Sequence, residues 1–276
     1  ERLTLVCGVF WRPWVFLLDR DGVINEDVGR PGVVRKQQFQ LLPGVPEALR
    51  RLRRRGGNYV AICTNQKSVP SLLSRQDLDD IHDEFFESDD SGGWCDLVLA
   101  ATEDPFLKPS PFLLHEALAR LAAPGSSSLT RRQRTRVVFP PEAGGDLKEE
   151  EEDSDPSTGG VLEALLRERA VFVGDAATDA MAAQRAGLDC HVLVTSSHHG
   201  RACLASTVAR PLPEASPPET AKPRTSAELA AAVSHATGGP SCLPNDEATP
   251  IAAAFPDLPT AIDALLDLID GRVAHS

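Results

Sequence analysis

The chain has 276 residues, of which 42% are hydrophobic and 25% charged, as expected for a globular protein of one domain or two small ones. Its formal net charge of −12 argues against nucleic acid or an anionic membrane surface as a partner.

Five short apolar runs predict strands that are buried on both faces of a parallel sheet. In chain order these runs are Val15–Leu18, Tyr59–Cys63, Asp96–Ala100, Ala170–Val173 and His191–Val194. Three of them run directly into polar residues: the first into Asp19, the second into Thr64, and the fourth into Gly174 and Asp175. We therefore expect polar side chains to gather at one edge of the sheet.

Helical patterns separate the predicted strands. In PEALRRLRRRG the apolar residues recur at i, i+3, i+4 and i+7 from Val45, and Gly56 supplies a stop. Ser74 and Ser110 are the expected N-caps of two further helices, the first running through Phe86 and the second starting at Pro111. We also predict a helix over 177–186, which ends at Gly187, and a terminal helix in FPDLPTAIDALLDLI. We expect the terminal helix to pack against the rest of the fold.

Strands that alternate with helices predict an α/β fold with a doubly wound, Rossmann-like parallel sheet. Two segments break the alternation. Residues 124 to about 160 contain SSS, RRQRTR and the acidic run DLKEEEEDSD, and residues 206 to about 248 are rich in Pro, Ala, Ser and Thr. Such compositions bury little apolar surface, so we predict two poorly ordered, low-complexity insertions in a single domain over 10–272.

The polar residues at the strand ends have the chemistry of phosphoryl transfer. In open α/β sheets, ligands bind at the carboxyl ends of the strands. Asp19 and Asp21 are two residues apart at a strand end, so alternation sends both to one side and Arg20 away from it. One carboxylate can attack phosphorus and the second can move the proton, while Gly22 allows a sharp turn.

An anionic nucleophile that attacks an anionic phosphate needs positive charge beside it. Asp19 and Asp175 offer hard oxygen ligands for Mg²⁺, and Lys108 supplies a second cation. Thr64 and Asn65 offer a hydroxyl and backbone N–H groups to phosphate oxygens, and Asp179 lies one helical turn after Asp175, where it can orient Lys108 or a metal-bound water. We also count Asp27 and Gln66 among the candidate substrate-binding residues.

Four segments, DRDGVIN, TNQ, the lysine of LKP and VGDAATDAM, resemble the motifs of the haloacid dehalogenase (HAD) superfamily of phosphohydrolases. The first of them, with LLPGVPEALRRLRRRGGNYVAICTNQ, is similar to the subgroup of heptose bisphosphate and histidinol-phosphate phosphatases. This resemblance implies a HAD-like fold with a minimal cap, Asp19 as nucleophile and Asp21 as general acid and base. It also implies Mg²⁺ on Asp19, the Asp21 carbonyl and Asp175, with Thr64 and Lys108 on phosphate.

The chain departs from that subgroup in two places. KSVPSLL (67–73) stands where the subgroup has a Gly-Ile…Arg-Gly segment. ATEDPFLKP lacks the Cys/His zinc loop and has Leu107 in place of an arginine, so no zinc is expected and recognition of a second phosphate stays open. The motifs also resemble those of polynucleotide 3′-phosphatases, whose lysine loop likewise lacks zinc ligands.

We therefore predict an enzyme that hydrolyses a small phosphorylated metabolite, such as a sugar phosphate, with Mg²⁺. The alternatives are nucleic-acid end processing and a catalytically idle scaffold, although a scaffold has no need of Asp21. His198 and His199 suggest a surface turn, since two adjacent histidines seldom bind one ion.

Cysteine usage and hydropathy indicate where the protein resides. Six widely spaced cysteines without a C-x-x-C pair argue against a disulfide framework or zinc ribbon and favour a reducing compartment. No apolar run reaches the ~18 residues of a membrane span, and we expect neither a membrane partner nor a signal peptide. We predict a cytoplasmic protein, with an upstream segment left open because the sequence starts at Glu1 rather than Met.

Overall fold

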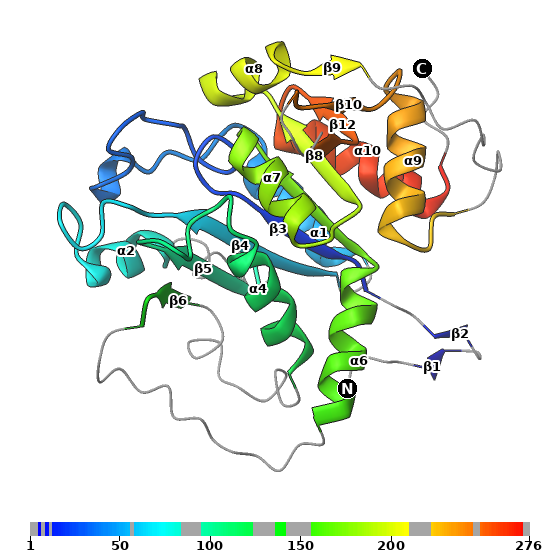
Figure 1. The fold of residues 1–276 in the computed structure, drawn as a ribbon, viewed down its shortest axis with the longest axis horizontal. Coiled ribbons are helices and arrows are strands. Elements are labelled where there is room, and N and C mark those ends of the chain that lie inside the picture. The colour runs from blue at the N-terminus through cyan, green and yellow to red at the C-terminus, as the bar shows by residue number, and fades with distance from the viewer. Residues whose placement is uncertain are drawn as a thin grey trace.

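The computed structural model describes residues 5–6, 9–10, 13–55, 58–83, 95–123, 136–141, 156–209, 222–244 and 249–272. Its centre is a parallel sheet of seven strands in the order β12-β8-β7-β3-β4-β5-β6 (Figure 1). The strands are β3 (Val15–Leu18), β4 (Tyr59–Asn65), β5 (Leu97–Ala101), β6 (Arg136–Phe139), β7 (Ala170–Gly174), β8 (Cys190–Val194) and β12 (Ala253–Phe255).

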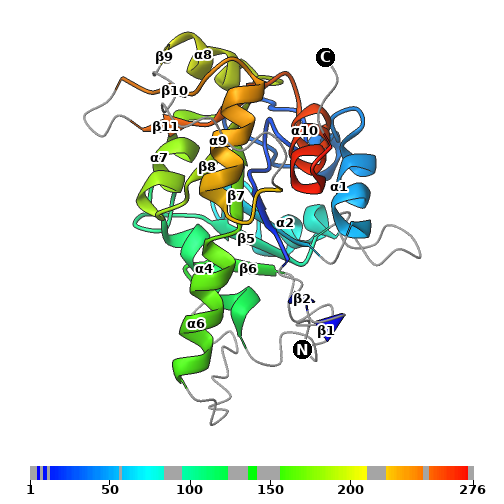
Figure 2. The same ribbon diagram turned by 90° about the vertical axis from the view of Figure 1, so that its right-hand side faces the viewer.

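Helices cover both faces of this sheet (Figure 2). One face packs against α1 (Val45–Arg54), α2 (Arg75–His82), α9 (Ser226–Ala236) and α10 (Leu258–Asp270). The other packs against α4 (Phe112–Ala122), α6 (Pro156–Arg167) and α7 (Ala177–Arg185). In β3, Phe16 and Leu18 enter the first core while Val15 and Leu17 enter the second, as the pleat of a strand requires.

Smaller elements surround the main sheet. They are the hairpin of β1 (Leu5–Val6) and β2 (Val9–Phe10), the 3₁₀ turn η1 (Lys36–Gln38), α8 (His198–Ala205), and the antiparallel strands β9 (Val208–Ala209), β10 (Ser241–Cys242) and β11 (Pro250–Ile251). No helix in the described parts of the chain is long and apolar enough to cross a membrane.

The predicted α/β fold is confirmed, and all five predicted strands are present with bounds that differ by at most two residues. Ser74 caps α2 as expected, because its side chain accepts from the backbone N–H of Asp77. The terminal helix α10 packs against α1, where Arg51 pairs with Asp263 at 3.0 Å and Arg55 with Asp270 at 2.6 Å. The predicted helix stop Gly56 and the end at Phe86 lie outside the described residues.

The prediction that 124–160 and 206–248 lack order was wrong over several elements. β6 lies in the first segment and pairs with β5, from Val98↔Arg136 to Ala101↔Phe139. In the second segment, α9 packs on β8 and α10, and β10 pairs with both β9 and β11. These short segments contain few large apolar residues. They are ordered by contacts with strands and helices that are far away in the sequence. The acidic run at 146–155 lies outside the described residues, and the division into one domain stays a prediction.

Two local expectations were also wrong. Helix α4 begins at Phe112 with Pro111 as its N-cap residue, although Ser110 Oγ still accepts from the Phe112 N–H at 3.4 Å. His198 and His199 form the first turn of α8 rather than a surface turn. Ser197 caps that helix, and a sequence of two histidines gave no sign of it.

The topology of the sheet fixes where a ligand can bind. β3 is the central strand of the seven, with β4, β5 and β6 on one side and β7, β8 and β12 on the other. The order of the strands therefore reverses at β3, and a crevice opens at the carboxyl end of such a switch point. Asp19 is the residue that follows β3, so the fold places it at this crevice.

Candidate active site

A pocket of about 740 Å³ lies at the carboxyl end of the sheet. All nine residues that the sequence predicts for the site line it: Asp19, Asp21, Asp27, Thr64, Asn65, Gln66, Lys108, Asp175 and Asp179. They come from the ends of β3, β4 and β7, from the loops after β3 and β5, and from the first turn of α7. Parallel strands thus bring together residues that are up to 160 positions apart.

The side chain of Lys108 joins two of the acids. Its Nζ lies 2.6 Å from Asp19 Oδ1 and 2.7 Å from Asp179 Oδ1, and the side chain is only 2% exposed. Burial by itself would lower the pKa of Lys108, but the charges of Asp179 and Asp19 raise it above its ordinary value. Lys108 is therefore a fixed cation beside Asp19.

Asp179 is held from behind by the backbone. Its Oδ2 accepts from the N–H groups of Asp175 at 3.1 Å and Ala176 at 3.0 Å, which leaves Oδ1 for Lys108. A Cβ on Gly174 would lie 2.5 Å from Asp179 Cβ, so only glycine allows this approach. Both oxygens of Asp179 are thus engaged, which makes it a positioning group for Lys108.

Asp175 lies close to Asp19, and the pKa values of both carboxyl groups are raised. Burial, followed by the charge of Asp19, raises the pKa of Asp175, and burial with the charge of Asp179 raises that of Asp19. Lys108 offsets only part of this effect on either carboxyl. The three buried carboxylates Asp19, Asp175 and Asp179 have one ammonium among them, which leaves negative charge that a further cation would compensate.

The carboxylate of Asp21 is held by four hydrogen-bond donor nitrogens. Arg20 reaches it with Nη2 at 2.8 Å and 2.9 Å and with Nε at 3.2 Å, Asn25 at 2.8 Å and Gln66 at 3.1 Å. Burial opposes ionisation, but Arg20 with the bonds from Asn25 and Gln66 lowers the pKa of Asp21 below its ordinary value.

Arg20 itself is fully buried, with its Nη1 3.1 Å from His82 Nε2 on α2. Alternation along the strand correctly sends Arg20 away from the pocket, which it does not line. Its long side chain nevertheless turns back to Asp21. Sequence reasoning missed this contact, because the direction of a flexible arginine is set by the surrounding core and not by the backbone period.

The segment Thr64-Asn65-Gln66 orders its neighbours through its side chains. Thr64 Oγ1 accepts from Gln66 Nε2 at 3.0 Å, so the hydroxyl proton of Thr64 is left for another acceptor. The Asn65 amide accepts from the Lys108 N–H at 2.9 Å and donates to the Lys108 carbonyl at 3.0 Å. Asn65 thereby fixes the loop that carries Lys108.

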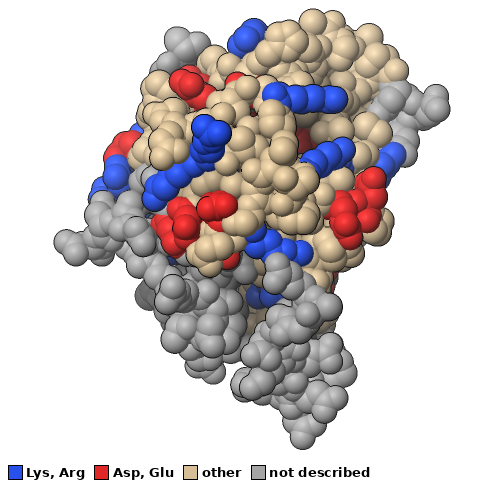
Figure 3. Space-filling view, turned by 90° about the vertical axis from the view of Figure 1, so that its left-hand side faces the viewer, with Lys and Arg blue, Asp and Glu red and all other residues tan. Residues whose placement is uncertain are grey.

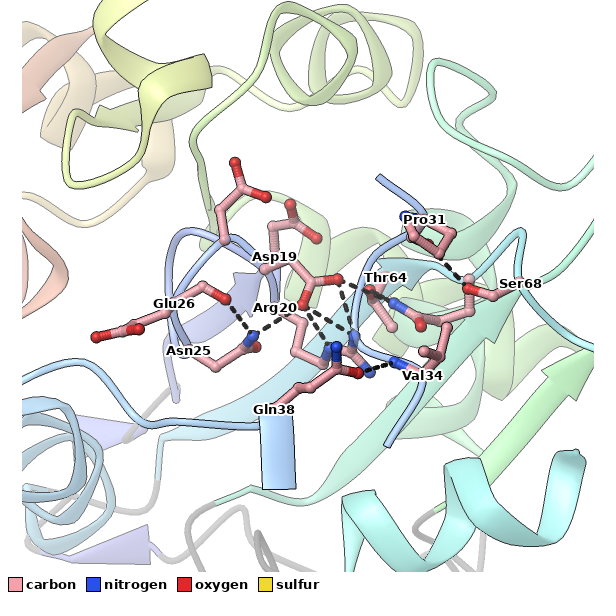
Figure 4. Close-up of polar contacts among 12 residues, drawn as sticks. Asp19, Arg20, Asn25, Glu26, Pro31, Val34, Gln38, Thr64 and Ser68 are labelled. Carbon is pink, nitrogen blue, oxygen red and sulfur yellow. Dashed lines mark hydrogen bonds and ion pairs between the residues drawn. The ribbon is translucent and has the colours of Figure 1, made fainter. Parts of the chain in front are cut away.

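Residues of the loops 27–32 and 66–72 form the outer wall of the pocket. Ser68 Oγ donates to the carbonyl of Pro31 at 3.0 Å and ties the two loops together (Figure 4). Asp27 accepts from the Gly29 N–H at 2.9 Å, and its other oxygen lies 3.6 Å from His199 Nε2 of α8. His199, for which the sequence predicts only a surface turn, lines the pocket.

The donor set fits a divalent hard cation. Among the residues that the structure describes, the group of potential metal ligands is Asp19, Asp175 and Asp179, with ligand atoms within 4.8 Å of one another. Since Lys108 and the backbone occupy Asp179, the oxygens left are those of Asp19 and Asp175 that face neither Lys108 nor Ser197. Carboxylate oxygens around uncompensated negative charge suit Mg²⁺.

Known proteins resemble parts of this chain in sequence. Residues 106–215 match the HAD-hydrolase-like family. The D-glycero-D-manno-heptose-1,7-bisphosphate 7-phosphatase of Chlorobaculum tepidum is 28% identical over 190 residues, 67% of this chain and 80% of that protein. The chain is similar to HAD-like hydrolases over these residues.

The expected similarity to the heptose bisphosphate phosphatase subgroup is confirmed by a second relative. The D-glycero-alpha-D-manno-heptose-1,7-bisphosphate 7-phosphatase of Mycobacterium tuberculosis is 43% identical over 70 residues, which are 25% of this chain and only 36% of that protein. A solved D,D-heptose 1.7-bisphosphate phosphatase from B. bronchiseptica, complexed with magnesium and phosphate, is 24% identical. That comparison covers 70% of this chain and 86% of the other, with a TM-score of 0.48.

Proposed function

We propose that this HAD-like chain is a phosphatase that hydrolyses a small phosphomonoester with Mg²⁺ through an aspartyl-phosphate on Asp19. The observation that carries the proposal is the buried cluster of Asp19, Lys108 and Asp175 at the topological switch point. A carboxylate nucleophile, a fixed ammonium and a second carboxylate for a metal are the groups that phosphoryl transfer to an aspartate requires.

In the first step an oxygen of Asp19 attacks phosphorus and the bond to the leaving oxygen breaks. Asp21 donates the proton that the leaving oxygen takes up. The free structure favours ionised Asp21, because only donors surround it, so the acid form depends on the negative charge of bound phosphate nearby. Lys108 and the Thr64 hydroxyl balance charge on the phosphate oxygens.

In the second step Asp21 accepts a proton from water while the water oxygen attacks phosphorus. The bond between phosphorus and Asp19 breaks, so inorganic phosphate leaves and the carboxylate is restored. The ionised form that Arg20 favours suits Asp21 as the base in this step. Asn65 acts through Lys108, and Gln66 through Thr64 and Asp21.

Mg²⁺ is the proposed cofactor, held by Asp19 and Asp175 with the Asp21 carbonyl as the third protein ligand. When bound, Mg²⁺ neutralises the phosphate oxygens and the carboxylates that face them. Asp179 remains the orienting residue. No zinc is expected in the loop before Lys108, which has neither Cys nor His.

The proposed substrate is a small phosphorylated metabolite, such as a sugar phosphate. The names of the relatives support a sugar bisphosphate, and a pocket of about 740 Å³ accommodates a ligand of that size. Asp27, at the outer wall, is proposed to contact the leaving group. Among the described residues on the face shown in Figure 3, positive and negative side chains are interspersed. A continuous basic stripe there would instead have favoured nucleic acid.

Turnover by the wild type and Asp19→Asn tests the proposal. We expect Mg²⁺-dependent release of phosphate from a sugar-phosphate panel, its loss in Asp19→Asn, and its loss with a chelator. Unchanged activity of Asp19→Asn would contradict the mechanism. Preference for a 3′-phosphorylated oligonucleotide would favour end processing, and absence of turnover across a broad phosphoester panel with Mg²⁺ bound would favour a scaffold.

A further inference from the structure

The turn that follows β8 reaches the site from a side that the four motifs do not cover. Ser197, the N-cap of α8, is 6% exposed, and its Oγ accepts from the Gly200 N–H at 2.9 Å. The same Oγ donates to Asp175 Oδ2. A hydroxyl has one proton, and because the helix N–H occupies a lone pair, that proton is directed to the carboxylate.

The first turn of α8 is fixed against the rest of the site. Ser196 Oγ donates to the Gly22 carbonyl at 2.6 Å. A Cβ on Gly22 would lie 2.8 Å from Ser197 Cβ and 2.0 Å from Asp175 Oδ2, so the three residues are in close contact. On the other side of the turn, a Cβ on Gly200 would lie 2.1 Å from the Val194 carbonyl. The hydroxyl therefore has one position relative to β7 and β3.

A neutral donor has a particular effect on Asp175. An ammonium or guanidinium at this place would cancel the charge of the carboxylate and compete with a metal for it. The hydroxyl of Ser197 fixes Oδ2 without placing a positive charge beside it, so Oδ1 stays available to a metal. Partners of this kind orient the ligands of metal sites.

We infer that Ser197 is a positioning residue that holds the Asp175 carboxylate ready for the metal. The inference rests on the proposed function, since it assumes that Asp175 is a Mg²⁺ ligand. It also links α8 to the metal site. The hydroxyl of Ser197 both caps the helix and orients Asp175, so the position of α8 and the geometry of the metal site depend on each other.

Mg²⁺ affinity, measured by calorimetric titration and by the shift of the thermal midpoint, tests the inference without turnover. Ser197→Ala is expected to bind Mg²⁺ about 10–100-fold more weakly than the wild type. Thr225→Ala is the matched control: Thr225 caps α9 by accepting from the Glu228 N–H at 3.2 Å, and it does not line the pocket. It should lose a similar amount of stability and bind Mg²⁺ as the wild type does.

Ser197→Gly covers the case in which the alanine variant does not fold. Glycine is nearly as good an N-cap as serine, so α8 is retained while the hydroxyl is removed. Weak Mg²⁺ binding in Ser197→Gly supports the inference, and wild-type affinity in Ser197→Gly or Ser197→Ala overturns it. Failure of the wild type itself to bind Mg²⁺ or release phosphate would instead overturn the proposed function.

Discussion

The ammonium group of Lys108 lies between Asp19 and Asp179, at 2.6 Å from the first and 2.7 Å from the second. Since the backbone N–H groups of Asp175 and Ala176 fix Asp179, the first turn of α7 determines where Lys108 sits. Lys108 in turn determines which oxygen of Asp19 faces the pocket. Asp19, the proposed nucleophile, is thus oriented through a chain of contacts that begins at the backbone after β7.

Lys108→Met should abolish turnover and destabilise the protein. The substitution leaves Asp19 and Asp179 buried without their counter-charge, a change that costs about 3 kcal/mol. Protonation of Asp19, whose pKa burial already raises, relieves part of this cost, so the loss should be larger at pH 8 than at pH 5. Urea unfolding at the two pH values measures it.

The stability control for this variant is Lys67→Met. Lys67 is exposed at the pocket rim, and its removal should change the free energy of unfolding by less than about 0.5 kcal/mol. An equal loss of unfolding free energy in both variants would show that the ion pairs of Lys108 do not stabilise the protein.

Gly22→Ala should disrupt the site far more than a glycine substitution elsewhere. Gly22 has φ +81°, and an added Cβ would lie 2.0 Å from Asp175 Oδ2. Gly187 has φ +69° but no atom within 4 Å of an added Cβ, so Gly187→Ala carries only the backbone strain, about 1 kcal/mol. We expect loss of Mg²⁺ binding and turnover in Gly22→Ala alone. Equal activity of the two variants would refute the close contact.

Arg20→Met should cost about 3 kcal/mol of stability, since it removes one member of a buried ion pair and leaves Asp21 with fewer donors. Chemical denaturation gives the free energy of unfolding. Arg120→Met is the control: Arg120 pairs with Glu116 one helical turn away on the surface of α4, and such pairs contribute about 0.3–0.5 kcal/mol. A loss below about 1 kcal/mol in Arg20→Met would contradict its structural role.

His191→Leu should flatten the dependence of stability on pH. His191 is 3% exposed in β8, its ring nitrogens have no hydrogen-bond partner among the described residues, and burial lowers its pKa to about 4. Between these pKa values the imidazole is protonated in the unfolded chain but not in the folded chain. The free energy of unfolding therefore falls by about 3 kcal/mol as the pH drops from about 6.5 towards 4.

In His191→Leu this loss should be absent, while stability at pH 7.5 stays equal or rises, because leucine needs no hydrogen bond. Unfolding midpoints across pH 4–7.5 provide the comparison. The same slope in both proteins would show that His191 does not carry the effect.

Much of the site is readable from the sequence. Apolar runs of four or five residues predicted β3, β4 and β7, and the residues that end them were Asp19, Thr64 and Asp175. Parallel strands end at one edge, so convergence follows from the order of the elements. Lys108 and Asp179 could also be predicted as site residues. Lys108 lies in the loop that follows a strand, and Asp179 lies one helical turn after a strand end.

Other parts depend on contacts that no local pattern encodes. β6 and β12 are only four and three residues long, and pairing with β5 and β8 makes them strands. Arg20 binds Asp21 because the buried surroundings of its guanidinium exclude water and leave that carboxylate as its partner. Ser197 reaches Asp175 across 22 residues, from the turn after β8, a strand that lies beside β7 only in the folded sheet.

The sequence by itself therefore determined which groups meet at the end of β3, since strand ends and their order are local properties of the chain. Only the tertiary structure decided how those groups are held. The orientation of Asp19 by Lys108, of Asp21 by Arg20 and of Asp175 by Ser197 depends on side-chain directions. Those directions are fixed by packing and by the need of buried polar groups for partners, which arise when the strands are assembled.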